Sequence, residues 1–336
     1  MVRSYVERFG VQTALLGVAV IWGWAFVAVA DAIELCPMYS FLAWRFALAS
    51  LAFVIFYPRV LRQLNAENLR MGLIAGGLLS AGYILQTWGL DGAGRTTPAR
   101  AAFITGLYVV ITPLVQAVVL KRRPRAATLV GGAIALAGLW VLSGIGSSAG
   151  GWVSGDTLVV LCAFAFTAHI AVLGSTHEGH DVAALTLVQL ATVAAVCAVI
   201  SVFKEHAPIP TDRSVLVAIV VTGVFASALA FVVQTWAQRE LPPSRVALIL
   251  VTETAFGGLF GWAASPVAPP LTELLGAGAM FVGLIVSEAV AAFSPADVGV
   301  TFEPAVEGMP TPVVGPSSSA VRSDDTERDS DLSDRG

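Results

Sequence analysis

The apolar stretch LVGGAIALAGLWVLS, Leu129 to Ser143, has a similar counterpart later in the same chain. A shift of 145 residues places it over LLGAGAMFVGLIVSE, Leu274 to Glu288. Both stretches are almost wholly apolar, and in both the small residues recur at the same positions. The glycines that coincide are Gly131 with Gly276 and Gly138 with Gly283. The two halves of the chain therefore contain copies of one unit.

Further matches extend this repeat toward the N-terminus of each copy. The same shift aligns Pro98-x-Arg100 with Pro243-x-Arg245. The triplet QTW occurs at Gln86 and again at Gln234, 148 residues later, so the first copy has a loop three residues longer at that point. A weaker match places Arg45 opposite Gln189.

Composition places these copies in a membrane. The 336 residues are 56% hydrophobic and only 12% charged, with a mean hydropathy of +0.79, whereas soluble domains are about 25% charged. Crossing the hydrocarbon takes roughly 20 apolar residues as a helix. The runs are too long and continuous for barrel strands, so we expect an all-α integral membrane protein. Ten spans are expected, near 11–30, 38–57, 70–90, 100–120, 126–145, 156–174, 182–203, 214–236, 244–263 and 271–293.

Lysine and arginine predict the orientation, because short cytoplasmic loops carry an excess of them. A cytoplasmic N-terminus puts ten bases inside and three outside, which favours that orientation, with a bacterial cytoplasmic membrane as the location. The inner set is Arg3, Arg8, Arg59, Arg62, Arg70, Lys121, Arg122, Arg123, Arg125 and Arg239, and the outer set is Arg95, Lys204 and Arg213.

Five spans per copy is an odd number, so the second copy must enter the membrane from the opposite side. We expect one five-helix repeat over 1–148, an inverted repeat over 149–293, and a tail over 294–336. The tail has nine acidic and three basic residues and few aromatics, which is typical of a disordered segment; it too is expected in the cytoplasm. Inverted repeats recur in transporters that alternate between two openings. The alternative, a bundle enlarged by duplication without transport, stays open.

Several motifs resemble those of the EamA-type permeases of the drug/metabolite transporter superfamily. They are FLAWRFALA from Phe41, TTPARAAFITGLYVVITPL from Thr96, and SRVALILVTETAFGGLFGW from Ser244. The resemblance covers roughly 11–290 and implies ten helices in two inverted halves that move amino acids, other small metabolites or toxic compounds, often outward. Relatives usually have proline after the acidic residue of the ninth helix. Here Thr254 follows Glu253, which leaves the bend of that helix open.

Two ionisable residues fall deep in predicted spans, where a charge is costly. Arg45 is a candidate for binding an anionic substrate group, or for a structural bond to helix carbonyls or an acid. Glu253 is the candidate for proton coupling, with a protonated, hydrogen-bonded structural carboxyl as the alternative.

Polar and aromatic residues at helical spacing predict a cavity near the bilayer midplane, where substrate sites of such folds lie. Stripes of this kind are expected on the third, fourth and eighth helices. Each residue could equally hold helices together, and His169 could be satisfied by a neighbour. The candidate cavity residues are Trp22, Trp24, Tyr83, Gln86, Thr105, Tyr108, Thr112, His169, Phe231 and Gln234.

Other chemistries lack a motif in this sequence. There is no G-x-x-x-x-G-K-[ST] phosphate loop, G-x-S-x-G elbow or H-E-x-x-H pair, so we expect neither an enzyme nor a cofactor or metal site, and no nucleic-acid partner. The expected partners are a small-molecule substrate, the lipid bilayer and protons. The sequence thus predicts a permease that exports its substrate, with a non-transporting receptor or a membrane-embedded enzyme as the alternative.

Overall fold

The computed structural model describes residues 2–119, 126–142, 151–174, 180–240, 246 and 249–293. The chain divides into two units, Met1–Phe302 and Glu303–Gly336, and every described residue belongs to the first. The expected tail over 294–336 lies outside the described residues, as does most of the loop between 175 and 180.

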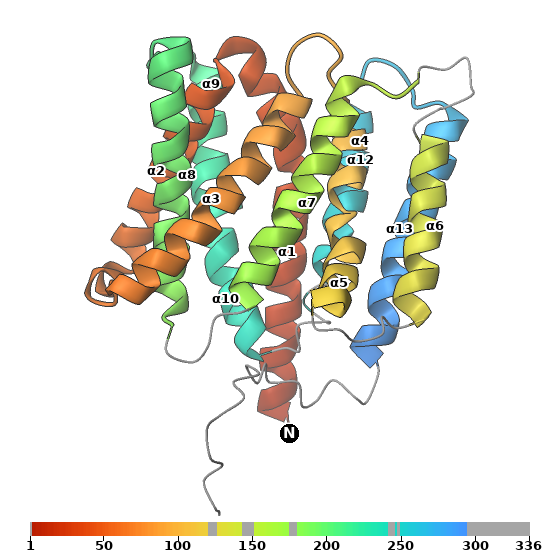
Figure 1. Cartoon of the computed structure of the whole chain (residues 1–336), viewed down its shortest axis with the longest axis horizontal. Coiled ribbons are helices and arrows are strands. Elements are labelled where there is room, and N and C mark those ends of the chain that lie inside the picture. Colours follow the sequence, from red (N-terminus) through yellow and green to blue (C-terminus); the bar gives the residue numbers. More distant parts are fainter. Residues whose placement is uncertain are drawn as a thin grey trace, which may run out of the picture. The chain divides into compact units, whose positions relative to one another are not determined.

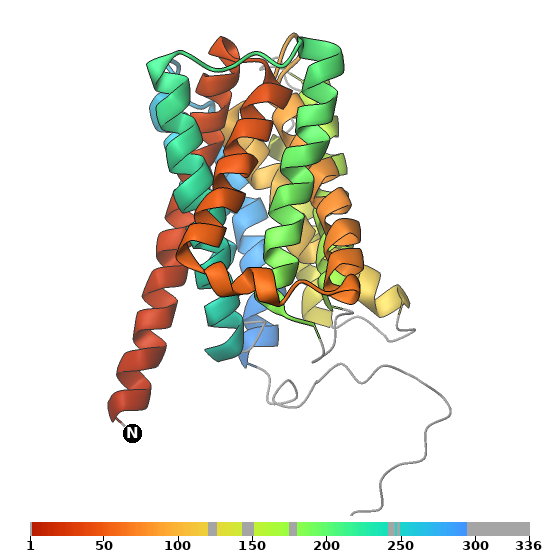
Figure 2. The ribbon, with the colours of Figure 1, turned by 90° about the vertical axis from the view of Figure 1, so that its left-hand side faces the viewer.

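The described residues form helices joined by short links, and none of them is in a strand (Figures 1 and 2). The helices follow one another along the chain in the order expected from the apolar runs. Their bounds are α1 Val2–Leu35, α2 Met38–Phe56, η1 Pro58–Arg62, α3 Ala66–Gly89, α4 Pro98–Thr105, α5 Tyr108–Val119, α6 Ala126–Leu142, α7 Ser154–Gly174, α8 Val182–Glu205, α9 Arg213–Val220, η2 Val221–Leu229, α10 Ala230–Glu240, α12 Thr252–Ala264 and α13 Leu271–Phe293.

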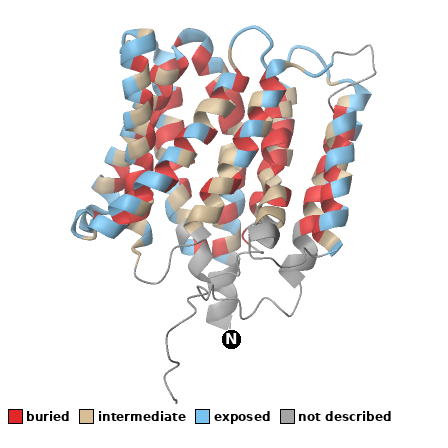
Figure 3. Cartoon of the chain, viewed as in Figure 1, coloured by how far each residue is buried: buried red, intermediate tan, exposed pale blue. Residues whose placement is uncertain are grey.

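The outer surface of this bundle is apolar. Six of the described helices are long and apolar enough to cross a membrane, and three shorter apolar helices accompany them. Large side chains such as Leu51, Trp140 and Leu259 are more than half exposed on the outer faces, and the buried residues concentrate on the faces that meet (Figure 3). Water would oppose exposure of so many apolar groups, whereas lipid accommodates them. The chain is a multi-pass membrane protein.

Besides the ninth span, described below, two expected spans differ from a continuous α-helix. The fourth is divided between α4 and α5 at Gly106 and Leu107. The eighth contains η2, a nine-residue π-helix between α9 and α10. Hydrophobic runs report which segment is apolar but not its hydrogen-bond register, so neither feature follows from the pattern.

Polar residues at the ends of the helices provide the missing hydrogen-bond partners. Asn65, Asp181 and Asp212 each accept a backbone N–H from the first turn of the helix that follows. Asp212 lies at the exposed end of α9, where the hydrogen bond from Ser214 holds its pKa below the usual range. The first turn of α2 has Pro37 at its N-cap and no side-chain cap of its own.

Glu205, the last residue of α8, supplies that missing cap from the other half of the chain. Its carboxylate accepts the backbone N–H groups of Tyr39 at 3.0 Å and Ser40 at 2.8 Å. The hydroxyl of Ser201 donates to the same carboxylate at 3.0 Å. A carboxylate at a helix N-terminus also meets the positive end of the helix dipole, so this contact ties the end of α8 to the start of α2.

The packing of the two copies is nearly symmetric. If the two copies are exchanged, the packing of α3 on α7 becomes that of α10 on α1. In the same way, the packing of α3 on α8 becomes that of η2 on α2. All four packings are present. The pairs α2 with α8 and α6 with α13 each map onto themselves, and α4 against α12 joins the expected fourth and ninth spans, which are also equivalent to each other. Helices of each copy therefore pack between helices of the other rather than forming two separate bundles.

The pair of α6 and α13 has its four repeated glycines at the crossing. A Cβ on Gly131 would lie 2.5 Å from the carbonyl oxygen of Gly283, and one on Gly276 would lie 2.8 Å from that of Gly138. Backbone meets backbone at both places, so no larger residue fits there. The order of these contacts makes α6 and α13 antiparallel, and exchange of the copies maps one contact onto the other.

Candidate functional site

The centre of the bundle lies where α4, α5 and α12 meet. Every residue of α4 from Ala101 to Thr105 is buried, which is typical of a helix surrounded by others. Small residues bring α12 close to α4, because a Cβ on Gly257 would clash with that of Ala102. This central pair positions the groups described next.

Both central helices are interrupted at mid-length. At Gly106 and Leu107 the α-helical pattern gives way to tighter bonds, with the N–H of Val109 donating to the carbonyl of Gly106 at 3.0 Å. In the second copy Val251 forms a turn before α12, and the N–H of Thr254 donates to the Val251 carbonyl at 3.1 Å. The two interruptions are equivalent, since Gly106 and Val251 are 145 residues apart.

Threonine side chains stabilise the interruption before α12. The hydroxyl of Thr254 donates to the Val251 carbonyl at 2.9 Å, and that of Thr252 donates to the Ile249 carbonyl at 2.6 Å. The helix thus begins anew just ahead of Glu253 although no proline is present. This answers the question that Thr254 had left open in the sequence.

Tyr108 and Glu253 are the second residues after these equivalent interruptions, and they lie opposite each other. The phenol of Tyr108 donates to Oε1 of Glu253 at 3.5 Å, the long end of hydrogen-bonding distance. Glu253 is only 7% exposed. The 145-residue shift that aligns the glycines also aligns these two residues. They are therefore equivalent positions of the two copies, and their contact joins one copy to the other.

A row of aromatic rings leads from Tyr108 across the bundle. Phe166 of α7 lies 6.4 Å from Tyr108 and 5.6 Å from Tyr83, measured between ring centroids, and both contacts are edge-to-face. Tyr83 in turn lies 4.7 Å from Phe46 of α2. Rings at these separations attract each other by edge and face. Phe166, which the sequence did not single out, is the bridge between the two tyrosines.

Arg45 lies at the other end of this row and is 4% exposed. Its guanidinium carbon is 5.0 Å from the Phe46 centroid and 5.2 Å from that of Tyr83. Nε and Nη2 each point to the hydroxyl oxygen of Ser227, at 3.4 Å. Ser227 belongs to the π-helix η2 and donates to the Thr222 carbonyl at 3.0 Å. π-helical turns occur frequently at functional sites.

The predicted polar stripes make two contacts across helices. Nε2 of Gln86 donates to the hydroxyl of Thr105 at 3.2 Å, joining α3 to α4. The hydroxyl of Thr112 donates to that of Thr167 at 3.5 Å, joining α5 to α7. Ser80, about two turns before Gln86 on α3, donates instead to the Gly76 carbonyl of its own helix at 2.6 Å.

The two tryptophans of the first span differ in their surroundings. Nε1 of Trp22 donates to the carbonyl of Ala226 in η2 at 2.7 Å, and its ring lies 6.2 Å from that of Phe231. Trp24 is half-buried on the same helix, and Gln234 is half-buried on α10. Trp22 and Phe231 are thus brought to the region of Ser227.

His169 lies apart from the aromatic row. It is 6% exposed, and Nε2 is 2.5 Å from Oε1 of Gln189. Gln189 donates from Nε2 to the carbonyl of Leu185 at 3.1 Å. The ring therefore has a neighbour in α8 for one of its nitrogens.

One buried ion pair was missed by the sequence analysis. Asp156, at the start of α7, is fully buried and accepts from Nη2 of Arg100 and from the hydroxyl of Thr96, both at 2.5 Å. The backbone N–H of Val153 donates to the same carboxylate at 3.1 Å. The Pro-x-Arg repeat had drawn attention to Arg100, but its partner is 56 residues away and not recognisable from spacing.

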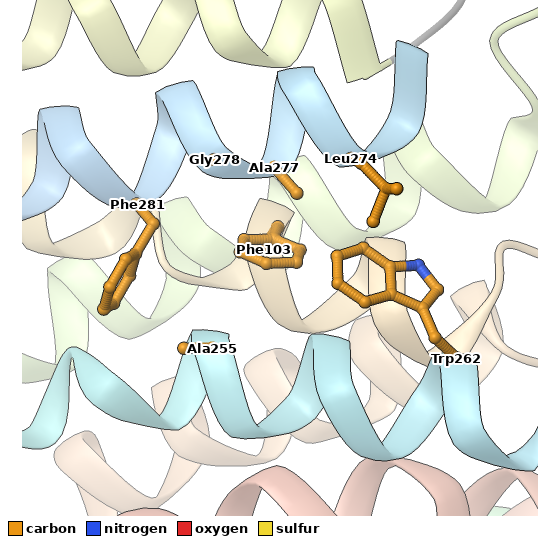
Figure 4. A pocket seen from close by; sticks show the side chains of 7 residues that line it. All are labelled: Phe103, Ala255, Trp262, Leu274, Ala277, Gly278 and Phe281. Atoms are coloured by element: carbon orange, nitrogen blue, oxygen red, sulfur yellow. The ribbon is translucent and has the colours of Figure 1, made fainter. Parts of the chain in front are cut away.

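A hollow of about 210 Å³ opens elsewhere, between α4, α12 and α13. Figure 4 shows the rings of Phe103, Trp262 and Phe281 around it. Its lining is apolar, and none of the predicted cavity residues contributes to it. No group of three His, Cys, Asp or Glu side chains in the described part of the chain is placed to hold a metal ion.

The chain is similar in sequence to known transporters and in fold to solved structures. The model of the EamA-like transporter family matches the chain twice, over residues 9–144 and 153–288. A protein of Archaeoglobus fulgidus described as an uncharacterized transporter is 30% identical over 281 residues, covering 84% of this chain and 86% of that protein. A solved structure described as "Crystal structure of protein" has a TM-score of 0.59 at 19% identity and covers 83% of this chain and 98% of its own. That likeness concerns the fold. The repeated match and the curated relative together identify this chain as a member of the EamA-like transporter family, a multi-pass membrane transporter of the drug/metabolite transporter superfamily.

Proposed function

We propose that this protein is a secondary transporter that moves a small metabolite, an amino acid or related compound or a toxic compound, outward by alternating access. The proposal assigns ten spans to two inverted five-helix repeats, 1–148 and 149–293. The single observation that carries it is the exchange symmetry of the packing, with the antiparallel α6 and α13 crossing at equivalent glycines. A two-fold axis across antiparallel helices lies in the membrane plane, as in inverted-repeat transporters.

The interruptions at Gly106 and Val251 support a hinge at the centre of this arrangement. Discontinuous helices near the midplane are a recurring feature of transporter sites. The half-helices α5 and α12 both begin there, and Tyr108 and Glu253 connect them. In the proposed cycle these half-helices tilt relative to α4 and to the segment before Val251, and the candidate cavity residues are exposed to one side at a time.

Glu253 is the proposed coupling group. An ionised carboxylate is unfavourable in an apolar interior, so the carboxyl holds its proton while the centre is closed and releases it when water enters from one side. Tyr108 donates to the carboxyl and so stabilises the ionised form at the moment of release. Protons are therefore proposed as the driving ion.

The orientation has both termini in the cytoplasm of a bacterial cell, in the cytoplasmic membrane. The distribution of lysine and arginine supports it. Two contacts join helix ends that this orientation places on the same side of the membrane. Trp262, near the end of α12, donates to Glu273, near the start of α13, at 2.9 Å. Arg95 pairs with Glu34 at 2.6 Å. Both contacts belong to the proposed outer side.

Inversion is tested by labelling equivalent loops. Leu64 and Ile209 are 145 residues apart, and they are 41% and 72% exposed. A cysteine at Leu64 should react with an impermeant maleimide from the cytoplasm, and one at Ile209 from outside. The native cysteines are buried and give a low background. Labelling of both positions from the same side would refute the inverted arrangement.

Transport and coupling are tested in proteoliposomes with a panel of labelled amino acids and cationic drugs. We expect flux that follows an imposed pH gradient. Glu253→Gln should abolish the response to the gradient while substrate exchange continues, and Glu34→Gln, at an exposed surface pair, is the matched control. Full gradient response in Glu253→Gln would exclude this residue as the coupling group. Specific binding without flux would favour a receptor.

A further inference from the structure

Among the described residues, two arginines, Arg45 and Arg100, have guanidinium groups that are largely buried, and their partners differ. Arg100 has the carboxylate of Asp156 as its counter-charge. Arg45 is more deeply buried, at 4% exposed, yet among the described residues no carboxylate lies within ion-pair distance of its guanidinium. A charged group in a span normally faces a partner or a pathway, so the difference between these two residues calls for a partner that binds to Arg45.

The contacts of Arg45 occupy only some of the N–H donors along the edge of its guanidinium. Phe46 and Tyr83 contact the group as rings, and a ring face accepts little from the in-plane N–H groups. Ser227 is the hydrogen-bond acceptor, and both of its distances are 3.4 Å, longer than the usual range of about 2.7–3.2 Å. A guanidinium has five N–H donors. One hydroxyl at long distance therefore leaves most of this donor capacity for another acceptor.

Several aromatic and polar side chains near Arg45 and Ser227 are only partly buried. Tyr83 is half-buried, as are Gln86 on the next turn of α3 and Trp22 and Phe231 near Ser227. The π-helix η2 holds Ser227 in place with its hydroxyl toward Arg45. Arg45 of α2 is thus contacted by Tyr83 of α3 and Ser227 of η2, and Trp22 of α1 contacts η2 at the adjacent residue Ala226.

We propose that Arg45, together with Ser227, binds a carboxylate group of the transported substrate. A carboxylate matches the planar edge of a guanidinium with two parallel hydrogen bonds, and its single charge balances the single charge of Arg45. A phosphate dianion would bring a second negative charge that no other described residue at this place neutralises. The inference rests on the proposed transport function, since it names the chemical class of the substrate for the same central site.

The test measures binding by the thermal midpoint of the purified full-length protein in detergent. The probes are propionate, hexanoate, benzoate and phenylacetate, each compared with its primary amide, which has nearly the same shape without the charge. Benzylphosphonate is added as the dianionic counterpart of phenylacetate. We expect at least one carboxylate to raise the midpoint while its amide does not.

Two substitutions locate the effect. Arg45→Met should weaken binding of that carboxylate roughly 10- to 100-fold, the factor expected when hydrogen bonds to a charged group are lost, and should leave amide binding unchanged. Arg45→Lys keeps the charge but loses the planar fork, so an intermediate affinity is expected and the proposal stays testable if the Met variant does not fold. Arg59→Met, at an exposed position of η1, is the control and should bind as the unaltered protein does.

The outcomes separate this inference from the transport proposal. No midpoint shift with any carboxylate, equal shifts with carboxylate and amide, stronger binding of benzylphosphonate, or undiminished binding in Arg45→Met would each overturn the inference. Flux of a neutral or cationic compound that persists in Arg45→Met would leave the transporter standing and remove the carboxylate site. Carboxylate binding that depends on Arg45 without flux of any compound would support the site and refute transport.

Discussion

Replacing Asp156 by asparagine removes the charge from the buried cluster at the start of α7. Asp156 accepts three hydrogen bonds, and Arg100, its charged partner, is 12% exposed. Nε of Arg100 already has no partner in the described structure, so the guanidinium depends on this carboxylate. Removal of one member of a buried pair typically costs about 3–5 kcal/mol, because the other charge stays buried without compensation.

The expected shift follows from the size of the bundle. An unfolding entropy of about 2.1 cal/mol/K per residue gives roughly 0.6 kcal/mol/K for about 290 residues. A loss of about 3–5 kcal/mol therefore lowers the thermal midpoint by roughly 5–8 °C. The measurement is the unfolding midpoint of the purified protein, with Glu34→Gln as the control because its pair with Arg95 is about half exposed and such pairs contribute at most about 1 kcal/mol.

A double variant tests the reasoning directly. Arg100→Met should destabilise by a similar amount when made alone, because it leaves the Asp156 carboxylate buried. Combined with Asp156→Asn it should cost much less than the sum, since neither charge then remains buried. Additive costs, or a midpoint of Asp156→Asn within 1 °C, as a rough limit, of the unaltered protein, would refute a coupled buried pair.

Three further predictions concern the packing of the helices. Gly276→Ala should lower the thermal midpoint because its Cβ would meet the Leu142 backbone, whereas Gly278→Ala on the same helix meets nothing within 4 Å and should be neutral or stabilising; equal effects would contradict a close crossing. Glu205→Gln should cost about 1 kcal/mol through the weakened cap on α2, measured by the same midpoint, and no loss would mean that the cap is dispensable. Trp22→Phe should cost about 1–3 kcal/mol by leaving the Ala226 carbonyl without its donor, more than Trp24→Phe, whose indole has no hydrogen-bond partner among the described residues; the reverse order would count against this role.

Much of the architecture is predictable from residue patterns alone. The apolar runs predict the order of the helices, and Gly131 and Gly276 indicate the repeat because they stand at equivalent positions of two similar apolar runs. The interruption at Gly106 was not predicted, since the surrounding run is continuously apolar and hydropathy carries no information about hydrogen-bond register. The turn at Val251 depends on threonine hydroxyls, which have no strong sequence signature.

The candidate site was predictable in its residue types but not in its contacts. Glu253 and Arg45 stood out because charges are rare in spans. Their neighbours come from distant segments: Ser227 is 182 residues from Arg45, and Tyr108 is 145 residues from Glu253. The second separation equals the repeat shift, so Tyr108 and Glu253 are equivalent positions of the two copies, and their pairing was predictable from the repeat. Ser227 belongs to the polar stripe predicted on the eighth helix, but its pairing with Arg45 had no such signal.

The contact between Tyr108 and Glu253 illustrates how a repeat within one polypeptide differs from a dimer of two identical subunits. A homodimer of a single five-helix protein would place identical residues on both sides of its axis, either two carboxyls that repel when ionised or two phenols with no acid between them. Joining the two units in one polypeptide allows each side to change independently. Here one side carries an acid and the other a donor for it, a division of roles that a symmetric dimer with identical subunits could not have.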